Sequence, residues 1–125
     1  MRCRVDDLPL EAFDGFHVTL DAGQLAGRNG VAILTRRAPE RVRSLAEVVT
    51  EISPGGRPTD LSAERIANRD LAAFSHEGRY VEVDLADAPV RVASLYLPKG
   101  AAWPYEEGTE EKYLRKMRFM RGLDR

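Results

Sequence analysis

Two adjacent extended segments constrain the fold most, because together they predict a β-hairpin. Residues 77–85 alternate in character and place Val81, Val83 and Leu85 on one face of a strand. A second extended segment, residues 90–97, follows after a four-residue turn. So short a connection predicts that the two strands pair antiparallel. The second strand is apolar on both faces, so we expect it to be covered on both sides, as in a layered α/β core.

Shorter patterns predict the elements that precede this hairpin. Residues 16–20 alternate and predict a half-buried strand with His17 on its exposed polar face. Residues 31–34 form a compact apolar run and predict a buried strand. Residues 42–52 carry apolar side chains at helical spacing and predict a short helix that begins near Pro39 or near Ser44. The Pro- and Gly-rich segment after residue 52 ends it.

The remaining segments predict one excursion and one helix. Residues 53–77 have no regular pattern and predict a surface excursion with one helical turn over residues 63–68. Thr109 is placed to cap a final helix that has acidic residues in its first turn and arginines later. The apolar stripe expected to pack this helix consists of Tyr113, Leu114, Met117, Met120 and Leu123.

Composition and charge exclude several classes of protein. A length of 125 residues fits one domain, and a net charge of -1 argues against a uniformly basic nucleic-acid binder. Cys3 is the only cysteine, so a reducing compartment is expected. No apolar run is long enough to cross a bilayer, and the N-terminal residues lack the apolar core of a signal peptide. We expect a cytoplasmic protein that does not bind a membrane.

Searching for reactive groups by motif finds little. No Ser/His/Asp or Cys/His arrangement and no zinc cluster is present, and His76 has no second ligand at a suitable spacing. Glu77, Glu82 and Asp84 are interpreted as solvated strand residues rather than ligands of a hard metal. The region from Arg28 to Arg43 is the most basic in the chain, and it is either a solvated face or a phosphate-binding patch.

Tyr96 is the strongest single candidate for a functional side chain. It lies at the end of the second hairpin strand, directly before a Pro-Lys-Gly loop. A phenol in that position either faces a ligand or belongs to the core with its hydroxyl at the rim.

Four segments, in this order, resemble exodeoxyribonuclease III, a member of the endonuclease/exonuclease/phosphatase superfamily. They are NGVAILT (29–35), EGRYVEV (77–83), VASLYLPKG (92–100) and KYLRKMRFM (112–120). The resemblance extends along nearly the whole chain and identifies residues 1–125 as a partial domain of this superfamily. It implies a DNase I-like, four-layer α/β sandwich, in which helices flank two mixed, largely antiparallel β-sheets.

The resemblance also implies an activity and a set of residues. Members of the family are monomers that use Mg²⁺ or Mn²⁺ to cleave double-stranded DNA beside abasic sites and to trim 3′ ends. Tyr96 matches the active-site tyrosine whose hydroxyl contacts the scissile phosphate. Lys99 occupies the position of an amide side chain that contacts the DNA backbone. The other residues implied to bind DNA are Gly27, Arg28, Asn29 and Arg79.

The sequence departs from the family in what it lacks. The chain starts just past the expected metal-binding Glu, and it ends before the Gly-Asp-x-Asn and Ser-Asp-His motifs. The expectation is therefore a domain truncated at both ends, with no metal ligand in this chain and no activity of its own. Two alternatives remain open, a non-catalytic DNA-binding or interaction fragment and a phosphatase of the same fold.

Overall fold

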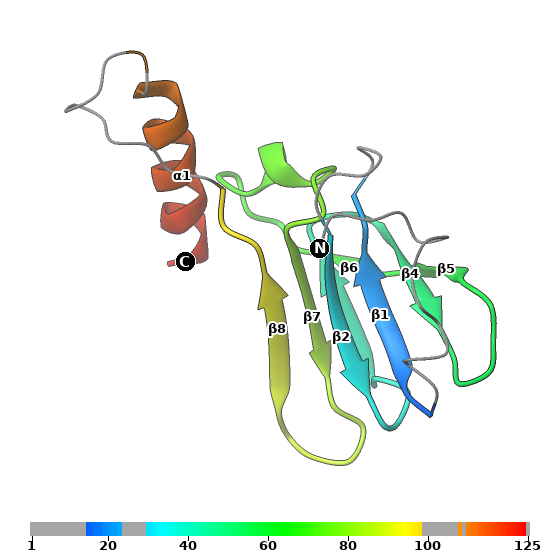
Figure 1. Cartoon of the computed structure of the whole chain (residues 1–125). Helices are drawn as coiled ribbons and strands as arrows, with labels where there is room; N and C mark the ends of the chain where they lie inside the picture. Colours follow the sequence, from blue (N-terminus) through cyan, green and yellow to red (C-terminus); the bar gives the residue numbers. More distant parts are fainter. Residues whose placement is uncertain (1–14, 24–29, 99–107, 109, 125) are drawn as a thin grey trace.

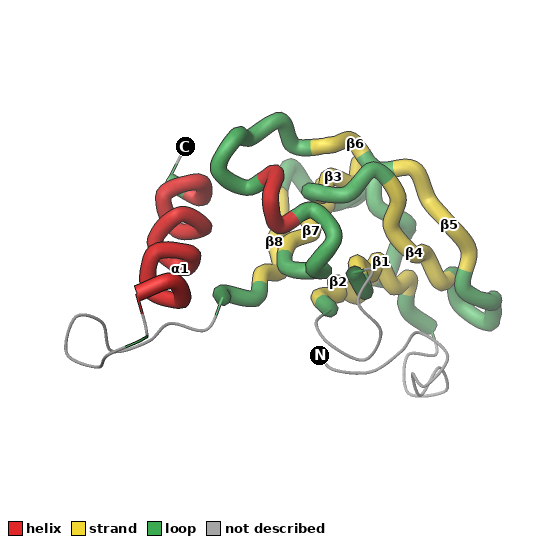
Figure 2. The backbone as a smooth tube through the Cα atoms, turned by 90° about the horizontal axis from the view of Figure 1, so that it is seen from above, coloured by secondary structure: helices red, strands yellow, loops and turns green. Residues whose placement is uncertain are grey.

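The computed structural model describes residues 15–23, 30–98, 108 and 110–124, and these form an α/β fold with two four-stranded sheets. Figure 1 shows the sheets with the single described α-helix, α1 (Glu110–Leu123), beyond strand β8. The view from above in Figure 2 separates a layer containing β1 and β2 from a layer containing β3 and β7. No helix in the described part of the chain is long and apolar enough to cross a membrane.

The first sheet is antiparallel throughout. Its order is β2-β1-β4-β5, and the strands are β1 (His17–Asp21), β2 (Val31–Thr35), β4 (Val48–Ile52) and β5 (Thr59–Ser62). In this register Thr19 lies opposite Ile33 on β2 and opposite Glu51 on β4.

The second sheet contains the predicted hairpin. Its order is β6-β3-β7-β8, and the strands are β3 (Arg41–Ser44), β6 (Glu64–Arg65), β7 (Tyr80–Asp84) and β8 (Arg91–Leu95). β7 and β8 pair antiparallel with Val83 opposite Val92, so the hairpin is confirmed. Among the strands that the structure describes, the short β3–β6 pair is the one parallel pair.

The main core lies between the two sheets. Val31 and Ile33 of β2 pack with Val81 and Val83 of β7, and all four side chains are buried. The predicted inward face of β7 is therefore confirmed. Val42, Leu85 and Tyr96 cover the margin of this cluster.

The strands of the first sheet differ from the predicted burial. β1 is buried on both faces, because Val18 and Leu20 pack with Ile52 on one side while Thr19 is buried on the other. His17 is only partly exposed, and its Nδ1 atom is buried without a hydrogen-bond partner. β2 is buried mainly on one face, since Leu34 is 41% exposed.

The helix predicted over residues 42–52 is wrong, because this segment forms β3 and β4. Val49 and Ile52 have helical spacing, yet they lie on opposite faces of β4 and are both buried there, whereas Val48 is 51% exposed. The segment after them, residues 53–77, lies largely at the surface as predicted, but it has more regular structure than expected. It contains β5, β6 and a 3₁₀ helix, η3 (Ala72–Phe74), and no helical turn forms over residues 63–68.

β8 is not covered on both faces as predicted. Val92 is 37% exposed and Leu95 is 44% exposed. The reason is its position, since among the described strands β8 pairs only with β7 and forms an edge of the sheet.

The final helix is confirmed, but a different face of it is packed. Phe119 is fully buried and meets Phe74 edge to face, with ring centroids 5.0 Å apart. Leu45 and Leu71 complete this cluster. The predicted stripe is wrong at Leu114, Met117 and Met120, which are exposed, whereas Leu123 packs against the cluster. Thr109, the predicted cap, lies outside the described residues.

Candidate functional site

Tyr96 follows the last residue of β8 and is tied to Arg79, which precedes the first residue of β7. The Tyr96 amide donates a hydrogen bond to the Arg79 carbonyl (2.8 Å), which extends the hairpin ladder by one residue pair. The Tyr96 side chain is partly buried at the margin of the core between the sheets. The hairpin therefore brings together two of the residues predicted for the site.

The Arg79 side chain is buried, and its polar atoms hold neighbouring groups. Its Nε donates to Glu77 Oε1 (2.9 Å), and a terminal nitrogen donates to the Tyr96 carbonyl (3.1 Å). Its Cζ lies 5.6 Å from the centroid of the Tyr96 ring. The Arg79 side chain is only 7% exposed, so Arg79 positions Tyr96 from the interior of the protein.

Glu77 links this pair to α1. Its second carboxylate oxygen accepts a hydrogen bond from Arg115, whose Cζ lies 4.7 Å from the centroid of the Phe74 ring. The Arg115 side chain is 42% exposed. Two guanidinium groups and one carboxylate leave one net positive charge in this cluster, and Arg115 presents it to solvent.

The interpretation of Glu77 as a solvated residue is wrong, since it is 7% exposed. The two arginines stabilise its buried charge. Burial by itself would raise the pKa of Glu77, but the hydrogen bonds from Arg115 and Arg79 outweigh it, so the pKa lies below its ordinary value.

A contact between two glycines fixes the cluster against the first sheet. Gly78 has a φ of +64° and Gly23, just after β1, has a φ of +71°. A Cβ atom on Gly78 would lie 2.7 Å from the Gly23 backbone nitrogen. The predicted DNA-contacting segment with Gly27, Arg28 and Asn29 continues from this contact, and these three residues and Lys99 lie outside the described residues.

A buried carboxylate lies directly before this glycine contact. Asp21 accepts hydrogen bonds from the Gly23 amide (3.0 Å) and from the Ser44 hydroxyl of the opposite sheet (3.0 Å). Burial raises the pKa of Asp21 despite these two bonds. Asp21 thus joins the two sheets through a polar contact next to the site.

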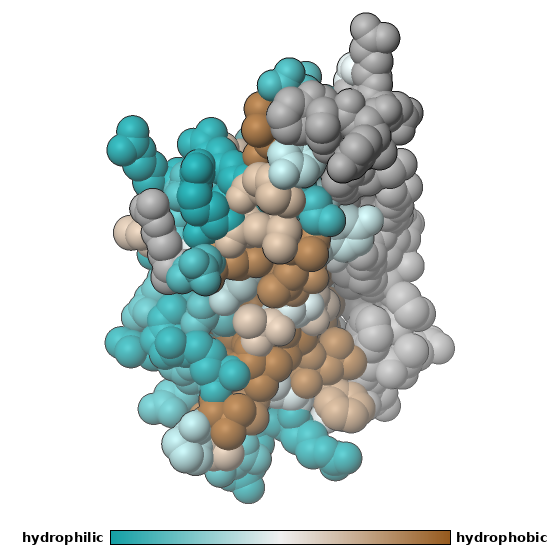
Figure 3. All heavy atoms as spheres, turned by 90° about the vertical axis from the view of Figure 1, so that its left-hand side faces the viewer, coloured by the Kyte–Doolittle hydropathy of each residue, from teal (hydrophilic) through white to brown (hydrophobic). Residues whose placement is uncertain are grey.

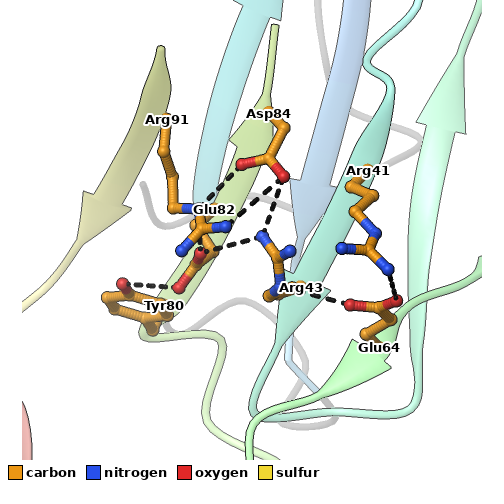
Figure 4. A network of polar contacts seen from close by, with 7 residues as sticks. All are labelled: Arg41, Arg43, Glu64, Tyr80, Glu82, Asp84 and Arg91. Atoms are coloured by element: carbon orange, nitrogen blue, oxygen red, sulfur yellow. Dashed lines mark hydrogen bonds and ion pairs between the residues drawn. The ribbon is translucent and has the colours of Figure 1, made fainter. Parts of the chain in front are cut away.

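A second polar cluster covers the outer face of the second sheet (Figure 4). Glu82 and Asp84 alternate along β7, and both form ion pairs with Arg43 of β3 and Arg91 of β8. The Tyr80 hydroxyl donates to Glu82 Oε1, and burial together with this bond raises the pKa of Tyr80 to about 12. Glu82 is 8% exposed, so its interpretation as solvated is also wrong.

The donor set around Tyr96 does not fit Mg²⁺. Both oxygens of Glu77 already accept hydrogen bonds from arginines. Among the residues that the structure describes, no three His, Cys, Asp or Glu side chains are grouped as metal ligands. A hard divalent cation prefers several oxygen ligands, so no catalytic step can be assigned to these residues.

Sequence reasoning missed Glu77, Arg115 and Phe74 as members of this cluster. Glu77 lies two residues before Arg79, so a paired carboxylate could have been suspected there. Arg115 lies 38 residues after Glu77 in the sequence, and no local pattern indicates that the two side chains are in contact.

We expect the ion pairs of Glu77 with Arg79 and Arg115 to make the free energy of unfolding depend on pH. Because the folded-state pKa is lowered, its contribution is complete above the ordinary pKa of glutamate and is lost as the pH falls through the folded-state value. Glu77→Gln should lower the free energy of unfolding at neutral pH by about 2 kcal/mol. It should also flatten the loss of stability in acid, measured by urea denaturation at a series of pH values.

The matched control is Glu47→Gln, which removes an exposed carboxylate 3.7 Å from Arg65. We expect a change of at most about 0.5 kcal/mol. Equal effects of the two substitutions at every pH would contradict a stabilising role of the buried cluster.

A comparison of the chain with family models, with curated proteins and with solved structures finds no match.

Proposed function

We propose that this chain is the central portion of an exodeoxyribonuclease III-like DNA-repair phosphodiesterase domain, and that its Tyr96 edge contacts DNA phosphates. The observation that supports this best is the position of Tyr96 at the end of β8, held by Arg79 through its backbone and its ring. The exposed guanidinium of Arg115 adds positive charge to the same cluster.

The proposal extends to the architecture. The two described sheets correspond to the inner layers of a four-layer, DNase I-like sandwich. A cytoplasmic location, a double-stranded DNA partner and the use of Mg²⁺ or Mn²⁺ by the complete domain belong to the same proposal. The metal ligands are assigned by the resemblance to segments that this chain does not contain.

Within this proposal Tyr96 supplies binding rather than bond cleavage. Its hydroxyl donates a hydrogen bond to a phosphate oxygen, and Arg79 fixes the tyrosine so that little conformational freedom is lost on contact. Cleavage of a phosphodiester also needs a group that activates water, and no described residue is in place for that step. The chain is therefore proposed to bind DNA without cutting it.

We expect weak, sequence-indifferent binding to duplex DNA that decreases steeply with salt, because phosphate contacts release counterions. Fluorescence anisotropy across a salt series, with intact and abasic-site duplexes, measures this. Tyr96→Phe should weaken binding by roughly threefold, the value of one modest hydrogen bond. Tyr113→Phe on α1 is the matched control and should leave the affinity unchanged.

The same duplexes incubated with Mg²⁺, with and without a chelator, test the absence of cleavage. Affinity that does not change with salt would contradict the proposed phosphate contact. Chelator-sensitive cleavage that disappears in Tyr96→Phe would show that the chain holds catalytic groups of its own.

A further inference from the structure

A small hollow lies at the end of β1, where the start of β4 and Ser75 complete its lining, and its volume is about 90 Å³. β1 and β4 lie away from β8 and α1 (Figure 1), whose exposed apolar side chains form the band in Figure 3. A second hollow of about 320 Å³ adjoins the first, because Ala46, Val48 and Ser75 line both. The two hollows therefore form one groove with an inner and an outer part.

Asp21 is the one charged residue among the described residues that line the inner hollow. It is 5% exposed, and each of its carboxylate oxygens accepts one hydrogen bond, from the Gly23 amide and from the Ser44 hydroxyl. A carboxylate oxygen can accept two hydrogen bonds, so each retains a free acceptor position. Both partners are neutral, and burial accordingly raises the pKa of Asp21. The hollow thus holds a buried acid whose charge no described cation balances.

We propose that the inner hollow binds a primary alkylammonium group, whose nitrogen donates a hydrogen bond to Asp21. An ammonium carries three N–H donors and one positive charge. Asp21 supplies the opposite charge and the free acceptor positions, and the hydroxyl-bearing Thr50 and Ser75 line the same hollow. This site goes beyond the proposed DNA contact and does not depend on it, because the carboxylate of Asp21 would repel a phosphate.

The size of the groove suits an alkyl chain that carries this group. A water molecule occupies about 30 Å³ in the liquid, so the inner hollow has room for roughly three groups of that size, an ammonium and two methylenes. The apolar residues that line it, Leu20, Val48 and Val49, provide contacts for the methylenes. The rest of the ligand lies in the outer hollow, where Glu47 and Arg65 form an ion pair (3.7 Å) and so favour neither sign of charge.

Other classes of ligand fit the inner hollow less well. A divalent cation prefers several charged oxygen ligands, and the part of the chain that the structure describes has no group of three His, Cys, Asp or Glu side chains. An anion would meet Asp21 with no cation among the described lining residues to offset it. A neutral alcohol donates one hydrogen bond but leaves the charge of the carboxylate unbalanced. The charge of the head group should therefore decide which ligand binds.

Three ligands of equal chain length test this: n-butylamine, 1-butanol and sodium butyrate, each titrated into the ¹⁵N-labelled full chain in phosphate buffer at neutral pH. The Gly23 amide donates to Asp21 and the Ala46 amide donates to the Ser44 hydroxyl, so the NMR shifts of both amides report on the hollow. Butylamine should give saturable shifts with a dissociation constant on the order of 1 mM. Butanol should bind about tenfold more weakly, and butyrate should not bind.

Two substitutions test the residues of the site. Asp21→Asn removes the charge and keeps the shape of the side chain, and the Ser44 hydroxyl still has the Tyr80 carbonyl as an acceptor, 3.2 Å away. It should weaken the binding of butylamine about tenfold. Ala46→Leu narrows the groove without altering Asp21 and should weaken binding to a similar extent. Asp60→Asn, which removes an exposed carboxylate from β5, is the matched control and should leave the affinity unchanged.

Equal shifts from butylamine, butanol and butyrate would overturn the proposal. So would an absence of shifts with butylamine at 100-fold its expected dissociation constant, or binding that neither Asp21→Asn nor Ala46→Leu weakens. Nα-acetyl-lysine amide carries the same ammonium group on a blocked amino acid, and it distinguishes two sources of the ligand. Binding tighter than that of butylamine assigns the site to a lysine side chain of a peptide, and weaker binding assigns it to a free amine.

Discussion

Replacing Gly78 with alanine is expected to lower the free energy of unfolding by about 4 kcal/mol, a large part of the total stability of a small domain. The new Cβ atom would lie 2.7 to 2.9 Å from backbone atoms of Gly23, Ala22 and Asp21. Backbone atoms cannot rotate away as a flexible side chain can, so the end of β1 would have to move. The positive φ of Gly78 adds strain for any residue with a Cβ. Urea denaturation measures the loss.

Gly55→Ala separates the two contributions. Gly55 has a φ of +72°, close to that of Gly78, but a Cβ atom there would have no neighbour within 4 Å. We expect this control to lose only about 1 kcal/mol, the value of the backbone strain alone. Equal losses in the two variants would mean that the glycine contact does not hold the site to the first sheet.

Phe119→Ala should destabilise the protein by a similar amount, about 4 kcal/mol. The side chain is fully buried, and its removal leaves a cavity among Leu45, Leu71 and Phe74. It is also the most deeply buried residue of α1, so the helix should separate from the sheets and take Arg115 away from Glu77. Denaturation together with hydrogen exchange of the α1 amides detects both effects.

Leu114→Ala removes an apolar side chain from the same helix at a position that is 50% exposed. The free energy of unfolding should change by no more than about 0.5 kcal/mol. A loss as large as that of Phe119→Ala would show that α1 packs through the stripe predicted from the sequence.

Local signals predicted the parts of the fold that depend on neighbouring residues. The alternation of Val81 and Val83, followed by a short turn, was sufficient for the hairpin and its inward face. The acidic start and basic end of α1 were sufficient for the helix, but not for the face that packs. Which face is buried depends on where Phe74 lies, and that position is set by the tertiary fold.

The failure over residues 42–52 has a different cause. β4 has an apolar side chain buried on each face, so its apolar residues show no clear period of two. Val49 is buried on one face and Ile52 on the other, and their spacing of three residues therefore resembled that of a helix.

The candidate site also contains one contact that follows from local sequence signals and one that depends on the tertiary fold. Tyr96 and Arg79 are near neighbours once the hairpin register is set, so their proximity follows from a local prediction. The hydrogen bond between Arg115 and Glu77 connects α1 to the segment just before β7, and the two residues are 38 positions apart in the sequence. It depends on how α1 lies against the sheets, which periodicity and composition do not determine.

The path of the chain through the two sheets has a consequence for how the protein folds. β3 belongs to the second sheet, the next two strands belong to the first, and β7 returns to pair with β3. Arg43 and Glu82, which meet across this pair, are 39 residues apart. Neither sheet can form from one uninterrupted stretch, so a long loop must close before either gains its central pairing. Folding should therefore be slow for a chain of this length, and the two sheets should form together rather than one after the other.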